Sequence, residues 1–171
     1  MSLRISFKQQ GKGHPVVLLH GFPMSGEIWP QEFIDILSQE FTVFIIDLPG
    51  FGGTPLPAEN LTLDEIAASV LEWSASQKLK SMVVIGHSLG GYITLAMVKQ
   101  QPEIMAGFGL FHATAFPDTE EKRQSRDKVI EFVKDNGAPA FTTNFIPPLF
   151  AGKQHPGIEK VKKIGATVSA S

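Results

Sequence analysis

The feature that most constrains this 171-residue chain is a serine placed between a strand pattern and a helix pattern. Residues 82–85 (Met-Val-Val-Ile) are apolar and β-branched, which is typical of a strand buried on both faces of a parallel sheet. Residues 86–90 (Gly-His-Ser-Leu-Gly) follow, and the apolar side chains after them recur at helical spacing. The two glycines lack Cβ atoms, so strand and helix can pack around a sharp turn that lifts the Ser88 hydroxyl clear. We predict that Ser88 is a catalytic nucleophile. The alternative is a glycine-rich connection between strand and helix in which the serine has no catalytic role.

Two further strand patterns also end in glycine-rich motifs. Residues 15–19 run into His-Gly-Phe-Pro at 20–23, and residues 41–46 run into Asp-Leu-Pro-Gly-Phe-Gly-Gly-Thr at 47–54. With these motifs and the one around Ser88, all in the expected order, the chain resembles the α/β-hydrolase family from about residue 3 to residue 112.

This resemblance implies a serine hydrolase that needs no cofactor. The N–H groups of Phe22 and Leu89 would form the oxyanion hole, and Ser88 would attack an ester or related acyl carbonyl. A small uncharged carboxylic ester or lactone is the expected substrate. Perhydrolase, C–C bond hydrolase and iminopeptidase relatives remain alternatives, as does a receptor or signalling member that uses its pocket for binding without hydrolysis.

The fold class is α/β, with a mostly parallel sheet and helices on both faces, because strand patterns alternate with helix patterns. One helix is expected to have Pro30 in its first turn, and another to open with a Thr62–Glu65 capping box. The expected strands cover residues 3–9 (an edge strand), 16–19, 42–46, 82–85 and 107–111. The family sheet continues with two more core strands, whose loops carry the triad acid and then the triad histidine. We therefore expect an N-terminal fragment whose acid and base lie beyond residue 171, and which is inactive in isolation.

Residues 1–112 are expected to form the hydrolase core, and residues 113–171 part of a helical cap. The cap should contain a charged helix that ends at Asn136-Gly137, an irregular apolar segment over 141–150, and a last helix opened by His155-Pro156. Three apolar side chains of the cap are candidate walls of the substrate pocket, although each could instead only attach the cap to the core: Phe145, Leu149 and Phe150.

Other residues near the motifs are expected to contact substrate or to support the site. The substrate-binding candidates from the core are His20, Gly21, Phe22, His87 and His112. Among them, His20 is expected to give a supporting hydrogen bond, the His87 side chain to point away from the substrate side, and His112 to face the rim of the site. The remaining histidines are expected to be a solvated loop residue (His14) and a helix cap (His155). Neither Asp47 nor Asp118 matches the triad acid, and no metal-binding spacing is present.

Composition excludes several classes of partner. The formal net charge of −2 gives no basis for binding nucleic acid or an anionic membrane, and the chain has no cysteine. The N-terminus shows no signal-peptide pattern and no apolar run is long enough to span a bilayer, so we expect a cytoplasmic protein whose partner is a small ester-like molecule. A homodimer that covers the apolar strand at 107–111 is also possible.

Overall fold

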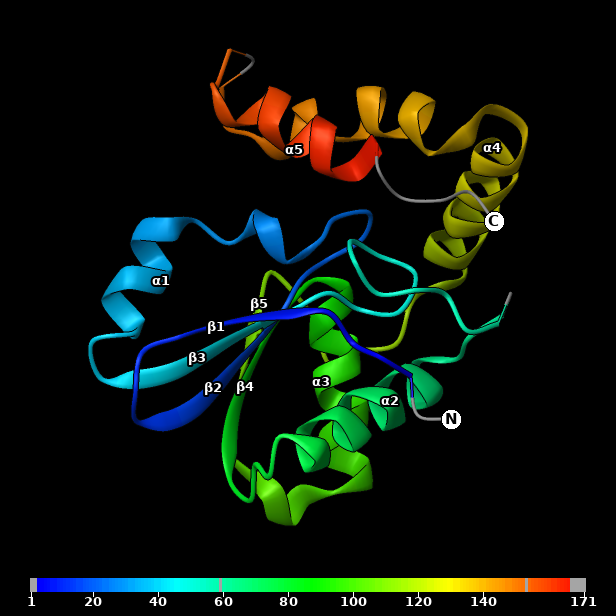
Figure 1. Ribbon diagram of the computed structural model, residues 1–171. Coiled ribbons are helices and arrows are strands. Elements are labelled where there is room, and N and C mark those ends of the chain that lie inside the picture. Colours follow the sequence, from blue (N-terminus) through cyan, green and yellow to red (C-terminus); the bar gives the residue numbers. More distant parts are fainter. Residues whose placement is uncertain (1–2, 59, 153, 167–171) are drawn as a thin grey trace.

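A five-stranded sheet lies at the centre of the computed structural model, which describes residues 3–58, 60–152 and 154–166. The strand order is β1-β3-β2-β4-β5 (Figure 1). Strand β1 pairs antiparallel with β3 at one edge, and all other pairs are parallel. The strands are β1 (Phe7–Gln10), β2 (His14–Leu19), β3 (Phe41–Ile46), β4 (Met82–His87) and β5 (Met105–Phe111). The mostly parallel α/β sheet is therefore confirmed.

Helices cover both faces of the sheet, as expected (Figure 1). Helix α1 packs on one face through Ile34, whereas α2 and α3 pack on the other through side chains such as Val70 and Ile93. The helices are η1 (Gly26–Ile28), α1 (Gln31–Leu37), α2 (Leu63–Ser76), α3 (Leu89–Gln100), η2 (Pro102–Ile104), α4 (Glu120–Phe145), η3 (Pro147–Leu149) and α5 (Gly157–Ala166).

Local sequence signals explain where these helices begin. Pro30 is the N-cap of α1, one residue before the first turn in which it was expected, and it has φ −62° and an extended ψ of 139°. Helix α2 begins with the predicted capping box, in which the Thr62 hydroxyl accepts a hydrogen bond from the Glu65 N–H and the Glu65 carboxylate accepts one from the Thr62 N–H.

Helix α4 is broken where the sequence predicted its end. Gly137 has φ 80° and ψ 162°, so the axis changes direction there. Residues 138–145 then continue as helix, and the predicted irregular segment over 141–150 is wrong in that part. The reason is Pro139, which lies in the first turn of the second half, where its missing N–H costs no hydrogen bond. The adjacent prolines at 147 and 148 begin the short η3.

Helices α4 and α5 lie over the loop that follows β2. Met24 of that loop is buried in one cluster with Ile146, Val161 and Ile164. The predicted last helix is thus present as α5, with its expected apolar face buried. Residues 167–171 of the expected cap lie outside the described residues.

Candidate active site

Ser88 lies at the junction of β4 and α3, in a backbone conformation that is uncommon for a residue with a side chain. Its φ is 50° and its ψ is −111°. The two flanking glycines permit this turn: a Cβ on Gly86 would collide with the Gly90 carbonyl, and a Cβ on Gly90 would lie 2.5 Å from the Leu19 oxygen. The Ser88 N–H donates to the Phe111 carbonyl at 3.0 Å, which ties the turn to the end of β5.

The loop after β2 passes directly beside Ser88. A Cβ on Gly21 would lie 3.1 Å from the Ser88 Cβ, so only glycine allows this approach. The next residue, Phe22, lines the same cavity as Ser88 and Leu89. Within the described part of the chain, neither the Phe22 nor the Leu89 N–H donates a hydrogen bond to another residue. Two free N–H donors therefore belong to residues that line the Ser88 cavity.

The cavity that contains Ser88 has a volume of about 500 Å³, within the range of small-molecule sites. One wall comes from the core and the other from α4. Its lining residues are Phe22, Ser88, Leu89, Tyr92, Lys122, Ser125, Arg126, Val129, Ile130, Phe141 and Phe145. Phe145 thus lies where the sequence predicted a pocket wall.

Leu149 and Phe150, the other two predicted walls, line a different groove. This apolar groove of about 580 Å³ lies between α1, the ends of β4 and β5, and the segment from η3 to α5. His87 also lines it, so its side chain points away from the Ser88 cavity, as expected. These three residues line this groove and not the Ser88 cavity, so their contact with a substrate stays a prediction.

Sequence reasoning missed two basic residues that line the Ser88 cavity. Arg126 donates to both carboxylate oxygens of Asp118, at 2.6 and 3.3 Å, and the pKa of that carboxyl is lowered mainly by this hydrogen bonding. Lys122 lies one helical turn before Arg126 and also lines the cavity. Their spacing of four residues was the available signal, since it places both on one face of a helix. The lining of the Ser88 cavity therefore includes two cationic side chains.

His20 is fully buried behind the loop and does not contact the cavity. Its Nε2 accepts a hydrogen bond from the Leu48 N–H at 3.0 Å, which leaves Nδ1 to donate to the Gly21 carbonyl at 3.0 Å. Burial lowers its pKa from 6.5 to about 4, so the ring is neutral at physiological pH. The expected supporting hydrogen bond is present, whereas direct contact with substrate is wrong.

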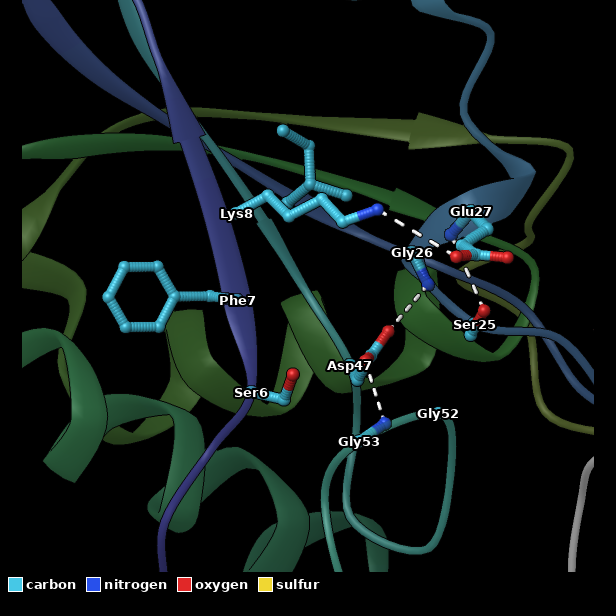
Figure 2. A pocket seen from close by; sticks show the side chains of 10 residues that line it. Ser6, Phe7, Lys8, Ser25, Gly26, Glu27, Asp47, Gly52 and Gly53 are labelled. Atoms are coloured by element: carbon cyan, nitrogen blue, oxygen red, sulfur yellow. Dashed lines mark hydrogen bonds and ion pairs between the residues drawn. The ribbon is translucent and has the colours of Figure 1, made fainter.

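Asp47 connects the start of η1 to the loop after β3 through two hydrogen bonds (Figure 2). Its Oδ1 accepts a hydrogen bond from the Gly26 N–H at 2.8 Å, and its Oδ2 accepts one from the Gly53 N–H at 2.9 Å. The small cavity in Figure 2 is lined by Asp47 but not by Ser88. The structural role predicted for this aspartate is confirmed.

The remaining histidines do not reach the Ser88 hydroxyl. The ring of His87 packs against Phe111 and Trp29, its Nδ1 is buried without a partner among the described residues, and burial lowers its pKa. His112 follows β5 with φ 47°; its side chain is exposed and does not line the Ser88 cavity.

Of the other two histidines, His155 lies as expected, whereas His14 is exposed as predicted but is the first residue of β2 and not a loop residue. His155 accepts a hydrogen bond from the Gly157 N–H at 3.0 Å at the start of α5, and His14 is exposed at the start of β2.

The described part of the chain lacks two further features. No three histidine, cysteine or acidic side chains there are grouped to hold a metal ion. No helix over the same residues is long and apolar enough to cross a membrane.

Comparison with known proteins identifies related chains. The family model of the alpha/beta hydrolase fold matches residues 14–151. A pimeloyl-[acyl-carrier protein] methyl ester esterase from Vibrio vulnificus is 35% identical over 97 residues, covering 57% of this chain and 36% of that protein. A 1-acylglycerol-3-phosphate O-acyltransferase from Rattus norvegicus is 29% identical over 128 residues, covering 72% of this chain and 36% of that protein.

Among solved structures, a thermophilic esterase from Thermogutta terrifontis with malate bound superposes with a TM-score of 0.87 at 29% identity. That match covers 97% of this chain and 62% of the esterase chain. The chain therefore spans about a third of the curated relatives named above and under two thirds of this structural relative.

Proposed function

Because the chain belongs to the α/β-hydrolase fold family, we propose that Ser88 is the nucleophile of a serine hydrolase that cleaves a carboxylic ester or lactone. The observation that carries this proposal is the position of Ser88. It lies on a strained strand-to-helix turn, at the wall of a cavity, with the loop of Gly21 against it. The esterases among the relatives support the same reaction class.

The chemistry follows from the groups around Ser88. Its Oγ attacks the carbonyl carbon, and the carbonyl oxygen becomes an oxyanion that accepts hydrogen bonds from the Phe22 and Leu89 N–H groups. Collapse of this intermediate expels the alcohol and leaves an acyl group on Ser88, which water then hydrolyses. Loss of one such donor costs roughly 3–4 kcal/mol of transition-state stabilisation in a comparable site.

The Ser88 proton requires a base. Among the described residues, no histidine is hydrogen-bonded to Ser88, and His112 and His87 face elsewhere. In this fold the triad acid and histidine follow the nucleophile in the chain. We therefore propose that a histidine outside the described residues takes the Ser88 proton, and that α4, which forms one wall of the cavity, belongs to a cap.

The cavity walls favour an acyl group with substantial apolar surface. Phe22 lies 5.8 Å from Phe141 between ring centres, and Phe141 stacks on Phe145 at 4.8 Å. Together with Val129 they form a continuous apolar lining next to Ser88. A receptor that only binds its ligand would share this cavity but would form no covalent bond to Ser88.

A fluorophosphonate probe tests the proposal. The complete gene product that contains this chain is incubated with the probe, and the labelled residue is mapped by peptide mass spectrometry. We expect one labelled serine, Ser88, with labelling lost in Ser88→Ala and retained in Ser81→Ala, an exposed serine elsewhere. Labelling that survives Ser88→Ala, or no labelling of the wild-type protein, contradicts the proposal.

A further inference from the structure

The first half of α4 presents one face to the Ser88 cavity. Residues 122, 125, 126, 129 and 130 line the cavity, and their spacing places them on neighbouring positions of one helix face. This face changes character along the helix: Val129 and Ile130 are apolar, whereas Lys122 and Arg126 are cationic. The two cations therefore belong to the same cavity as the nucleophile.

The positive charge at this cavity is only partly neutralised. Arg126 is held by both oxygens of Asp118, and its guanidinium also lies 5.8 Å from the centre of the Tyr92 ring. Lys122, by contrast, forms no ion pair with any residue that the structure describes. No acidic side chain is among the described lining residues, and the Asp118 carboxylate that Arg126 holds is also near enough to Lys122 and Arg123 for both to lower its pKa. Three cations therefore surround one carboxylate, and positive charge is in excess at this end of the cavity.

We propose that Lys122 selects a substrate that carries a single negative charge away from the scissile carbonyl, such as a half-ester of a dicarboxylic acid. The inference rests on the proposed function of Ser88 and defines its substrate class. The apolar wall accommodates the chain that joins the two carbonyl groups, while the Lys122 ammonium pairs with the free carboxylate. The single ammonium of Lys122 fits a monoanion better than a dianion such as phosphate.

The arrangement also gives each basic residue a distinct role. Arg126 is held in place by Asp118 and keeps the helix face oriented, whereas the flexible Lys122 ammonium is free to move toward a bound anion. Because Lys122 is exposed, its contribution to discrimination is modest and depends on salt.

The test compares two substrates of the complete gene product. They are the 4-nitrophenyl ester of glutaric acid with its second carboxyl free, and the same compound with that carboxyl as a methyl ester. The measured quantity is the ratio of their kcat/KM values, from release of nitrophenol. Lys122→Met is expected to lower this ratio by about two- to fivefold, whereas Lys122→Arg should largely preserve it.

A matched control uses another lysine of the same helix. Lys128 is exposed and does not line the cavity, so Lys128→Met removes the same charge from the protein without touching the site. We expect this variant to keep the wild-type ratio. A second measurement needs no turnover: monomethyl glutarate should protect Ser88 from the fluorophosphonate probe at lower concentration than dimethyl glutarate, and Lys122→Met should remove that difference.

The outcomes separate this inference from the proposed function. If both esters are cleaved and Ser88 is labelled, but Lys122→Met leaves the ratio and the protection unchanged, the inference is wrong and the proposed function stands. An equal decrease of the kcat/KM ratio in Lys122→Met and in Lys128→Met also overturns the inference, because that result would reflect the net charge of the protein and not a contact with the substrate. If Ser88 is neither labelled nor needed for turnover, both fail.

Discussion

The Nε2 of His20 accepts a hydrogen bond from the Leu48 N–H at 3.0 Å, and this contact joins the loop after β2 to the turn after β3. Asp47, the residue before Leu48, makes a second connection by accepting from the Gly26 N–H. Phe22 lies between these two points of attachment. The loop that carries the Phe22 N–H is therefore held on both sides, by the His20–Leu48 hydrogen bond and by the Gly26–Asp47 hydrogen bond.

Burial of the His20 ring makes stability depend on pH. Burial holds the pKa of His20 at about 4 in the folded protein, below its ordinary value of 6.5. Between those values the unfolded chain binds a proton that the folded chain does not. His20 should therefore make its full contribution to the free energy of unfolding above about pH 6.5. As the pH falls toward 4, this contribution should decrease by up to about 1.4 kcal/mol per pH unit.

Urea denaturation of wild-type protein and His20→Gln at a series of pH values checks this dependence. The variant should be less stable at pH 7.5 and should lose less stability on acidification. The pKa of His87 is also lowered by burial, so only the difference between the two proteins isolates His20. Parallel curves would show that His20 does not titrate as described.

A methyl group on Gly90 should damage the fold at the Ser88 turn. The added Cβ would lie 2.5 Å from the Leu19 oxygen and 2.8 Å from the His20 oxygen, both of them backbone atoms that cannot yield. We expect Gly90→Ala to lower the free energy of unfolding by about 1–3 kcal/mol or more. Gly152→Ala is the control, because an added Cβ there meets nothing within 4 Å, and it should change stability by less than about 0.5 kcal/mol.

The free edge of β5 should promote self-association of the chain. Met105–Phe111 contains no charged residue, it pairs only with β4 in the described structure, and Phe108 and Phe111 are 49% and 51% exposed. Natural edge strands are usually protected by charges or by covering segments. Size-exclusion chromatography with light scattering should show a concentration-dependent dimer of the 171-residue chain.

Phe108→Lys should shift that equilibrium toward monomer, because a charge on the edge opposes strand pairing. Phe116→Lys is a suitable comparison, since Phe116 is 82% exposed and lies outside the sheet. A monomer at all concentrations, or an equal effect of both substitutions, would argue against association through β5.

Short-range patterns made the core of the fold predictable. The strands before Ser88, before His20 and before Asp47 were each marked by apolar runs that end in glycine-rich motifs, and the Thr62–Glu65 box marked a helix start. These signals are local, because a turn, a cap or a buried strand depends on a few adjacent residues. The structural roles of Asp47 and His155 followed from the same kind of signal.

The cavity wall was less predictable because it depends on how distant elements meet. Nothing local in the sequence shows that α4 turns Lys122 and Arg126 toward Ser88, or that Leu149 lies in the groove behind the turn. The helix over 138–145 was missed for another reason. Asn136-Gly137 and the adjacent prolines at 147 and 148 predicted an irregular segment, whereas the helix restarts after Gly137 with Pro139 in its first turn, a position that a proline tolerates.

The central claim, that Ser88 forms a covalent acyl intermediate, is tested most directly by trapping that intermediate. The complete gene product is mixed with a 4-nitrophenyl ester of a bulky acid that deacylates slowly, quenched in acid, and examined by intact-protein and peptide mass spectrometry. We predict a mass increase of one acyl group, located on the peptide that contains Ser88 and absent from Ser88→Ala. Ester turnover by Ser88→Ala at the wild-type rate, or an acyl group on another residue, would contradict the account.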